Sequence, residues 1–111
     1  MNPNPNPNPD SPVVEYDMGY AADEFGKVLQ GPFTGERTDF VSAELGRHRW
    51  RVTLDGTDFA VLIAVADAPP RKIGLFSLPV LKVRFEFEST DAEIRERFFH
   101  RFHQYFHKGG G

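Results

Sequence analysis

The stretch RHRWRVTLDGTDFAVLIAVA, residues 47–66, decides the fold. Its first eight residues alternate: one set of side chains is His48, Trp50, Val52 and Leu54, and the other is Arg47, Arg49, Arg51 and Thr53. A strict period of two predicts a strand with one buried face. The dipeptide Asp55-Gly56 then predicts a tight hairpin turn, in which both central residues have positive φ. The return segment 59–66 is continuously apolar, which predicts a strand in the centre of the sheet.

Two further strands are predicted on the C-terminal side of this hairpin. Residues 82–88 alternate apolar and charged side chains, which is typical of a strand with one buried face. Residues 73–78 predict a separate strand, which the stiff segment Ala-Pro-Pro at 68–70 divides from the hairpin. Pro79 cannot donate a ladder hydrogen bond, so a bulge, a bend or an edge position is expected there.

The N-terminal side predicts shorter elements. Residues 13–17 favour a short edge strand, and residues 40–45 favour another strand that ends at a bend at Gly46. Between them, residues 20–30 predict a helix, because Tyr20, Phe25, Val28 and Leu29 can share one side. The glycine and proline that follow Gln30 predict its end.

A second helix is predicted over residues 91–107. Thr90 and Glu93 have the spacing of a capping box, and Gly109 predicts the exit from the helix. One side of this helix is apolar, which predicts packing on the apolar face of the sheet. Its apolar side chains are Ile94, Phe98, Phe102, Tyr105 and Phe106. Phe99 lies on the flank of that face, where it could form part of a homodimer contact.

These elements predict a single α+β domain over residues 13–108. Its expected core is an antiparallel sheet of about four strands with two helices packed on one face, in the order α-β-β-β-β-α. The four Asn-Pro repeats within residues 1–12 predict a disordered tail, because proline disfavours the helical region for the residue before it. Residues 109–111 are three glycines and predict a flexible end.

The composition limits the functional classes. The chain of 111 residues has no cysteine, which excludes disulfides and thiolate metal sites. It has no secretory signal and no apolar stretch that could span a bilayer, so a cytoplasmic protein without a membrane partner is expected. The net charge of −3 is unevenly distributed: residues 1–46 sum to −6 and residues 47–84 sum to +4. The basic middle could meet an acidic partner or the chain's own acidic N-terminal part.

A histidine stripe on the second helix is one candidate site. Glu96, His100, His103 and His107 are spaced by four, three and four residues and therefore share one face. Imidazoles four residues apart can bind a divalent metal such as zinc, and a carboxylate could join them. The alternatives are a solvent-exposed polar face and a pH-sensitive contact surface. The sequence predicts no cofactor, and a divalent metal on this face is the alternative.

An arginine stripe is the second candidate site. Arg47, Arg49 and Arg51 project from one face of the first strand of the hairpin, with Lys82 and Arg84 expected nearby. This surface could bind an acidic protein segment or a small anion. Nucleic acid is disfavoured, because the only aromatic residue of that strand, Trp50, is expected on the opposite face. The alternative is a solvated face that Glu86 and Glu88 neutralise across the strands.

Signatures of catalysis are sparse, which favours a protein that is not an enzyme. No nucleophile elbow is present, and the glycine spacing at 26–31 lacks the lysine of a phosphate-binding loop. The sequence therefore predicts a non-catalytic binding or adaptor module that uses a charged sheet face. A metal-binding protein or a small hydrolytic or isomerising enzyme that uses histidines is one alternative, and a nucleic-acid-binding domain is another. Both a monomer and a homodimer are compatible with the sequence.

Overall fold

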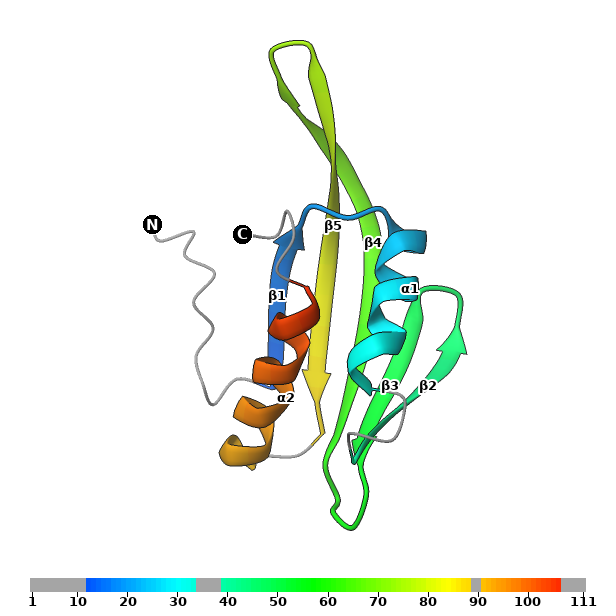
Figure 1. Ribbon diagram of the computed structural model, residues 1–111, viewed down its shortest axis with the longest axis vertical. Helices are drawn as coiled ribbons and strands as arrows, with labels where there is room; N and C mark the ends of the chain where they lie inside the picture. Colours follow the sequence, from blue (N-terminus) through cyan, green and yellow to red (C-terminus); the bar gives the residue numbers. More distant parts are fainter. Residues whose placement is uncertain (1–11, 34–38, 89–90, 107–111) are drawn as a thin grey trace.

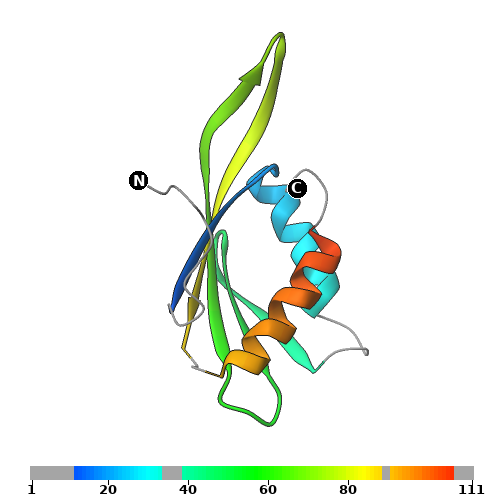
Figure 2. The same ribbon diagram turned by 90° about the vertical axis from the view of Figure 1, so that its left-hand side faces the viewer.

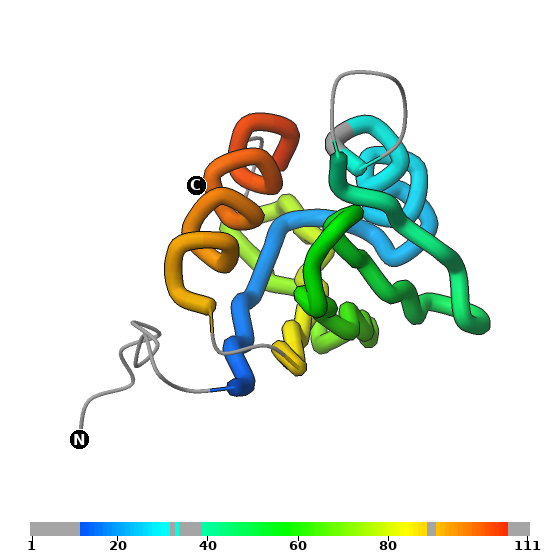
Figure 3. The backbone as a smooth tube through the Cα atoms, turned by 90° about the horizontal axis from the view of Figure 1, so that it is seen from below, coloured from blue at the N-terminus to red at the C-terminus, as the bar shows by residue number. Residues whose placement is uncertain are grey.

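The computed structural model describes residues 12–33, 39–88 and 91–106. It contains five strands and two helices. In chain order they are β1 (Val13–Met18), α1 (Ala22–Phe33), β2 (Phe40–Gly46), β3 (Arg49–Leu54), β4 (Ala60–Ile73), β5 (Phe76–Phe87) and α2 (Ala92–Tyr105). The strands form one antiparallel sheet in the order β1-β5-β4-β3-β2, as Figure 1 shows. Both helices lie on the same face of the sheet (Figures 2 and 3).

The predicted α+β class, with two helices on one face, is confirmed. The sheet has five strands rather than four, because β1 pairs along β5 from Val13 opposite Glu86 to Met18 opposite Leu81. The order is therefore β-α-β-β-β-β-α. The predicted tail at 1–12, except Pro12, and the predicted flexible end at 109–111 lie outside the described residues.

The alternation predicted for β3 is present, but it begins later than expected. Trp50, Val52 and Leu54 are buried beneath the helices, and Arg49 and Arg51 are exposed on the other face. His48 does not share the buried face, because it lies in the turn between β2 and β3 with φ of +61°. The alternation of the sequence could not predict the position of His48, because a turn residue with left-handed backbone does not follow the in-and-out alternation of a strand.

The hairpin between β3 and β4 differs from the predicted two-residue turn. The connection extends from Asp55 to Phe59, and only Gly56 has positive φ in it. The hydroxyl of Thr57 donates to the carbonyl of Leu54 at 2.9 Å and accepts from the amide of Phe59 at 3.1 Å. The amide of Thr57 also donates to the carbonyl of Leu54 at 3.2 Å, so Asp55 and Gly56 do form a β-turn, but Asp55 lacks the positive φ of the predicted turn type and the loop continues to Phe59.

The prediction of a break at Ala68-Pro69-Pro70 is wrong. β4 continues to Ile73, and the chain turns at Gly74 and Leu75 before β5 begins. The two prolines lie in a register shift between Ala68 and Arg71, where the ladder is interrupted in any case. The predicted separate strand at 73–78 is therefore wrong, because it contains the turn: Ile73 ends β4, and residues 76–78 begin β5, which continues through the predicted strand at 82–88. The hairpin of β4 and β5 projects beyond the rest of the sheet (Figure 1), and its projecting part, residues 68–80, is called the arm below.

Helix α1 extends past the predicted stop and ends at Phe33. A proline in the last turn removes one helical hydrogen bond, but the extra turn buries Phe33 completely. The ring of Phe33 stacks on Phe98 of α2, with centroids 4.9 Å apart. Packing of the core therefore outweighs the local preference for a helix end. Close packing also explains a glycine in this helix, because a Cβ at Gly26 would lie only 3.1 Å from Cζ2 of Trp50.

Asp91 is the N-cap of helix α2, and Thr90, the predicted member of the capping box, lies outside the described residues. The carboxylate of Asp91 accepts from the amide of Ile94 at 3.0 Å, which satisfies one of the free amides of the first turn. At the other end, the amide of Phe106 donates to the carbonyl of Phe102 at 3.0 Å. The proposed exit at Gly109 also lies outside the described residues.

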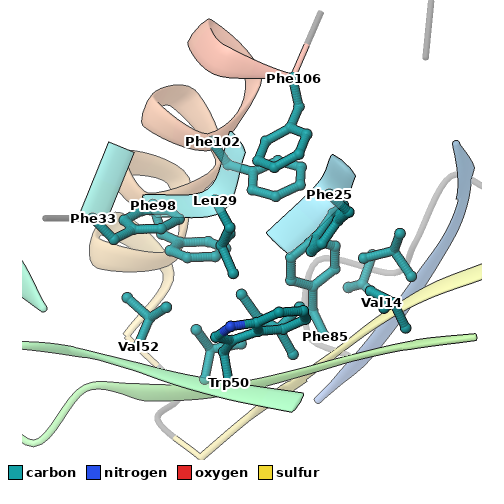
Figure 4. Packing of buried hydrophobic residues seen from close by; sticks show 14 of the residues in the cluster. Val14, Phe25, Leu29, Phe33, Trp50, Val52, Phe85, Phe98, Phe102 and Phe106 are labelled. Atoms are coloured by element: carbon teal, nitrogen blue, oxygen red, sulfur yellow. The ribbon is translucent and has the colours of Figure 1, made fainter. Parts of the chain in front are cut away.

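The core between the helices and the sheet is aromatic, as Figure 4 shows. Among the described residues it contains no buried polar or charged side chain. The fully buried phenylalanine rings come from both helices, from β5 and from the loop before β4; they are Phe25, Phe33, Phe59, Phe85, Phe98 and Phe102. Edge-to-face and stacked ring pairs dominate this core, which gives it a specific geometry in addition to hydrophobic stabilisation.

Candidate functional site

The face of the sheet opposite α1 and α2 is called the outer face below, and neither of these two helices lies over it (Figure 2). Its middle is a strip of small and apolar side chains from β4, made by Leu62, Ala64 and Ala66. Charged side chains of both signs lie on the strands to either side. They are Glu15 and Asp17 of β1, Arg49 and Arg51 of β3, Lys82, Arg84 and Glu86 of β5, and Glu88 directly after β5.

Three of these cations have acidic neighbours on the same face: Lys82 and Arg84 of β5, and Arg51 of β3. Lys82 lies 3.5 Å from Asp17, and Arg84 lies 3.9 Å from Glu15 and 4.0 Å from Glu86. Each pair is at least partly exposed, so it contributes about 0–1 kcal/mol. The basic middle of the chain therefore meets the acidic β1, one of the two arrangements that the charge distribution indicates.

The ion pair of Arg51 spans the central strand. A guanidinium nitrogen of Arg51 on β3 donates to Glu88 at 3.1 Å, across β4. Small residues in the middle of the face allow this long side chain to reach over the strand between them. The predicted neutralisation of the arginine stripe by Glu88 is thus present for Arg51.

Arg47 and Arg49 differ from the other members of the predicted stripe. Within the part of the chain that the structure describes, neither has an ion-pair partner, and both are exposed. Arg49 lies on the outer face, whereas Arg47 lies in the turn between β2 and β3 and not on the strand. The structure therefore brings Arg49, Arg51, Lys82 and Arg84 onto one face and leaves Arg47 at its end.

Beside Arg49 the outer face is hollowed. The hollow has a volume of about 170 Å³, and its lining includes Leu45, Leu62, Arg49, Arg84 and Glu86. The aliphatic side chains give it an apolar part, and the two arginines give it positive charge that Glu86, 4.0 Å from Arg84, offsets in part. Leu45 and Val41 of β2 are both large, apolar and exposed. The sequence reasoning missed them, although they alternate with the buried Phe40 and their side could have been read from that period.

The histidine stripe is only partly described. Glu96 and His100 are exposed on α2, and Nε2 of His100 lies 3.4 Å from the side-chain nitrogen of Gln104. Among the described residues, no group of three or more histidine, aspartate or glutamate side chains could hold a metal. His107 lies outside the described residues, so the predicted stripe of four stays a prediction.

His103 has an aromatic environment instead of a polar one. Its ring stacks on Phe99 with centroids 5.8 Å apart and meets the edge of Tyr16 of β1 at 5.9 Å. This partial burial lowers the pKa of His103 below its ordinary value of 6.5, because the imidazolium loses hydration. Burial also raises the pKa of Tyr16, and the nearby positive charge of Arg95 opposes that rise.

The lowered pKa of His103 predicts a pH dependence of stability. Below pH 6.5 the unfolded chain binds a proton at this residue more readily than the folded chain, so the free energy of unfolding falls as the pH decreases through this range. We expect His103→Gln to lose less stability than the wild type between pH 7.5 and pH 5, as measured by urea denaturation. The control is His100→Gln, one turn earlier with an exposed ring, which should keep the wild-type difference. An unchanged pH dependence of His103→Gln would contradict the packing of its ring against Tyr16 and Phe99.

His48, the remaining histidine, lies beside the start of α1. Its Nε2 is 3.6 Å from a carboxylate oxygen of Asp23, and the carboxylate is largely exposed. No histidine lines the hollow beside Arg49, and none lines a second hollow between the end of β1 and the start of β5, next to Met18 and Leu78. The pair therefore has no described cavity in which a substrate would meet it.

No protein-family model, no curated protein and no solved structure matches this chain. Of the two helices in residues 12–33, 39–88 and 91–106, neither is long and apolar enough to cross a membrane.

Proposed function

We propose that the protein is a non-catalytic binding module whose outer face holds an acidic protein segment that also carries apolar side chains. The observation that carries this proposal is the exposed Arg49 without an ion-pair partner among the described residues, next to the hollow and the exposed Leu45. An unpaired cation attracts a carboxylate, and exposed apolar surface beside it gains free energy when a partner covers it.

The distribution of charge on the outer face favours one position for such a segment, over β2 and β3. The acids Glu15 and Asp17 lie at the β1 side, and Arg49, which has no ion-pair partner in the described part of the chain, lies at the β3 side. An acidic segment would be repelled at β1 and attracted towards β2 and β3. The exposed apolar residues Val41 and Leu45 lie on this same side, which gives the segment a surface for its own apolar residues.

The same face is poorly suited to nucleic acid. Stacking of bases requires exposed aromatic side chains, whereas Trp50 is buried under the helices and the aromatic rings of β5 at 85 and 87 face the core. Acidic protein is therefore the better class of ligand for this surface.

The test uses a displayed library of twelve-residue peptides, from which binders are selected against the full chain and their affinities are measured. We expect the binders to be rich in acidic and large apolar residues. Arg49→Glu should weaken their binding by about tenfold or more, because it replaces an attraction by a repulsion. Lys27→Glu makes the same change of charge at an exposed site on α1 and should leave binding within about twofold.

Two outcomes would contradict the proposal. One is that Arg49→Glu and Lys27→Glu weaken binding equally, which would show attraction by overall charge alone. The other is that selected peptides bind to the helix side, seen as changes in the amide NMR signals of α1 and α2 and not of β2 and β3. Raised salt should weaken binding to the wild type more than binding to Arg49→Glu, because one attraction has already been removed in that variant.

A further inference from the structure

Strand β2 is an edge of the sheet. It is the last strand in the order β1-β5-β4-β3-β2, and no helix or strand of the described ranges lies beyond it (Figure 1). An edge strand presents backbone amides and carbonyls that a further strand can bind, and proteins often protect such an edge with proline or lysine. Strand β2 contains neither residue.

The hydrogen-bond pattern of the sheet identifies the backbone groups on this edge. The amide of Asp55 donates to the carbonyl of Asp39 at 3.1 Å, so the odd-numbered residues of β2 exchange hydrogen bonds with β3. The hydrogen bonds between β3 and β4 follow the complementary pattern. The amides and carbonyls of Ser42 and Glu44 therefore point away from β3. Within the described ranges, no other segment forms a backbone hydrogen bond with them.

The outer-face side chains of the two edge strands differ in charge. On β1, Glu15 and Asp17 would repel the carboxylates of an acidic segment. On β2, the outer-face side chains are the uncharged Val41, Ala43 and Leu45. Val41 is 46% exposed and Leu45 is 52% exposed, so a strand beside β2 would cover apolar surface. Charge and apolar surface both favour β2.

We propose that the acidic segment binds as a sixth strand of the sheet, antiparallel to β2. This binding mode rests on the function proposed above, because it requires an acidic segment as the ligand. The backbone of the segment pairs with Ser42 and Glu44, and its outer-face side chains lie against Val41 and Leu45. In such strand addition, backbone hydrogen bonds give affinity and alternate side chains give specificity. The antiparallel direction continues the pairing of the sheet and is the slightly more stable one.

Arg49 is placed to bind a carboxylate of the added strand. Its partner on β2 is Gly46, which has no side chain, and a Cβ at Gly46 would meet no atom of the described residues within 4 Å, its chain neighbours apart. The described residues therefore leave open the way from Arg49 to a strand beyond β2. Arg51 demonstrates the reach, because its guanidinium crosses β4 to bind Glu88 at 3.1 Å. Arg49 crosses β2 in the same way.

The residues of β2 set the order of side chains in the segment. In the antiparallel direction, the acid beside Leu45 and Gly46 precedes the apolar residues of the segment. The apolar residues follow at the second and fourth positions after the acid, opposite Ala43 and Val41, because alternate residues share the outer face. The residue directly after the acid lies opposite Glu44, which would repel a second acid. The predicted order is acid, non-acid, apolar, any residue, apolar.

The first test measures hydrogen exchange of backbone amides by NMR, on the full chain with and without the tightest acidic peptide from the displayed library. We expect the amides of Ser42 and Glu44 to exchange about tenfold or more slowly with the peptide bound, because they then donate to it. The amides of Val41 and Ala43 already donate to β3 and should change less.

The outcomes of this test separate strand addition from the proposed function. Peptide binding that leaves the exchange of Ser42 and Glu44 unchanged overturns strand addition and leaves the acidic ligand standing. Absence of any peptide binding overturns both. Slow exchange of these two amides without peptide, lost on dilution, would assign the edge to a second copy of the chain and overturn the proposal.

The second test changes the backbone of the peptide and leaves the protein as it is. Each residue of the peptide is N-methylated in turn, which removes one amide hydrogen and keeps the side chain. Alternate amides of an added strand face β2, so binding should weaken by about tenfold or more at every second residue and by less than about threefold at the others. Equal effects at all positions overturn the proposal.

A matched pair of variants tests the edge from the side of the protein. Ser42→Pro removes the outward amide hydrogen and should weaken peptide binding by about tenfold or more. Ser42→Ala removes only the hydroxyl and should leave binding within about twofold. Both variants should fold, as measured by urea denaturation, because the amide at position 42 does not donate to β3. Equal binding by two folded variants overturns the proposal; if Ser42→Pro does not fold, the N-methylated peptides decide.

Discussion

Phe98→Ala is expected to lower the free energy of unfolding by about 3–5 kcal/mol, the largest loss for any single substitution that we propose. Phe98 of α2 is completely buried and joins both helices to the sheet. Its ring stacks on Phe33 of α1 and meets the edges of Phe85 and Phe87 of β5 at 5.8 and 5.9 Å. Removal of the ring leaves a cavity between rigid aromatic neighbours, which can close it only partly. Urea denaturation followed by circular dichroism measures the loss.

The control for Phe98→Ala is Phe76→Ala, which makes the same chemical change on the exposed arm. This variant should stay within about 0.5 kcal/mol of the wild type. A loss below about 1 kcal/mol for Phe98→Ala would show that the ring is not at the centre of the core. Comparable losses for the two variants would contradict the assignment of the arm as exposed.

Much of the core follows from periodicity in the sequence. The alternation around Trp50 and Val52 and that around Phe85 and Phe87 each predict one buried face, and the structure buries those residues. The apolar side of the second helix also predicted the burial of Phe98 and Phe102 correctly, but Tyr105, which was assigned to the same side, is 43% exposed. These predictions succeed because burial of large apolar side chains dominates the free energy of folding, and its pattern is local in the sequence.

The arm and the end of α1 could not be predicted from local rules. Pro69 and Pro70 indicate a break when they are read alone, but the long hairpin tolerates them because its ladder shifts register there. Similarly, Pro32 indicates a helix end, yet burial of Phe33 against Phe98 favours another turn. In both places a contact between residues distant in the sequence decides the outcome, and local propensity does not contain that information.

The charged face was predicted in its membership but not in its pairing. Strand alternation places Arg49 and Arg51 on one side, as the structure shows. Which acid lies beside each arginine depends on strand order and register. The ion pair between Arg51 and Glu88 across β4 depends on both strand order and register. The sequence could therefore predict that acids of the neighbouring strands neutralise this face, but not which acid pairs with Arg51. The position of β1 next to β5, which places Asp17 beside Lys82, likewise comes from the topology.

Gly26→Val is expected to lower the free energy of unfolding by about 1–3 kcal/mol, because the added methyl groups have no space above the sheet. A Cβ at this position would lie 3.1 Å from the buried indole of Trp50, so even one carbon is tight. Gly26→Ala should be near neutral: alanine favours a helix over glycine by about 1 kcal/mol, and the close contact offsets that gain. Lys27→Val, at the next and exposed position of α1, should lose less than about 0.7 kcal/mol, since only helix propensity changes there.

The cause of the loss in Gly26→Val can be separated by a double-mutant cycle with Trp50→Phe. Phenylalanine is smaller than tryptophan, so the same Gly26→Val change should lower stability less in the Trp50→Phe background, with a coupling free energy of about 1 kcal/mol. Absence of coupling would mean that the helix does not rest on the indole. Coupling would establish that the glycine, which weakens the helix when considered alone, is required because α1 approaches β3 closely. That approach places the ring centroids of Phe25 and Trp50 5.6 Å apart. It closes the core over β3, the strand whose opposite face carries Arg49.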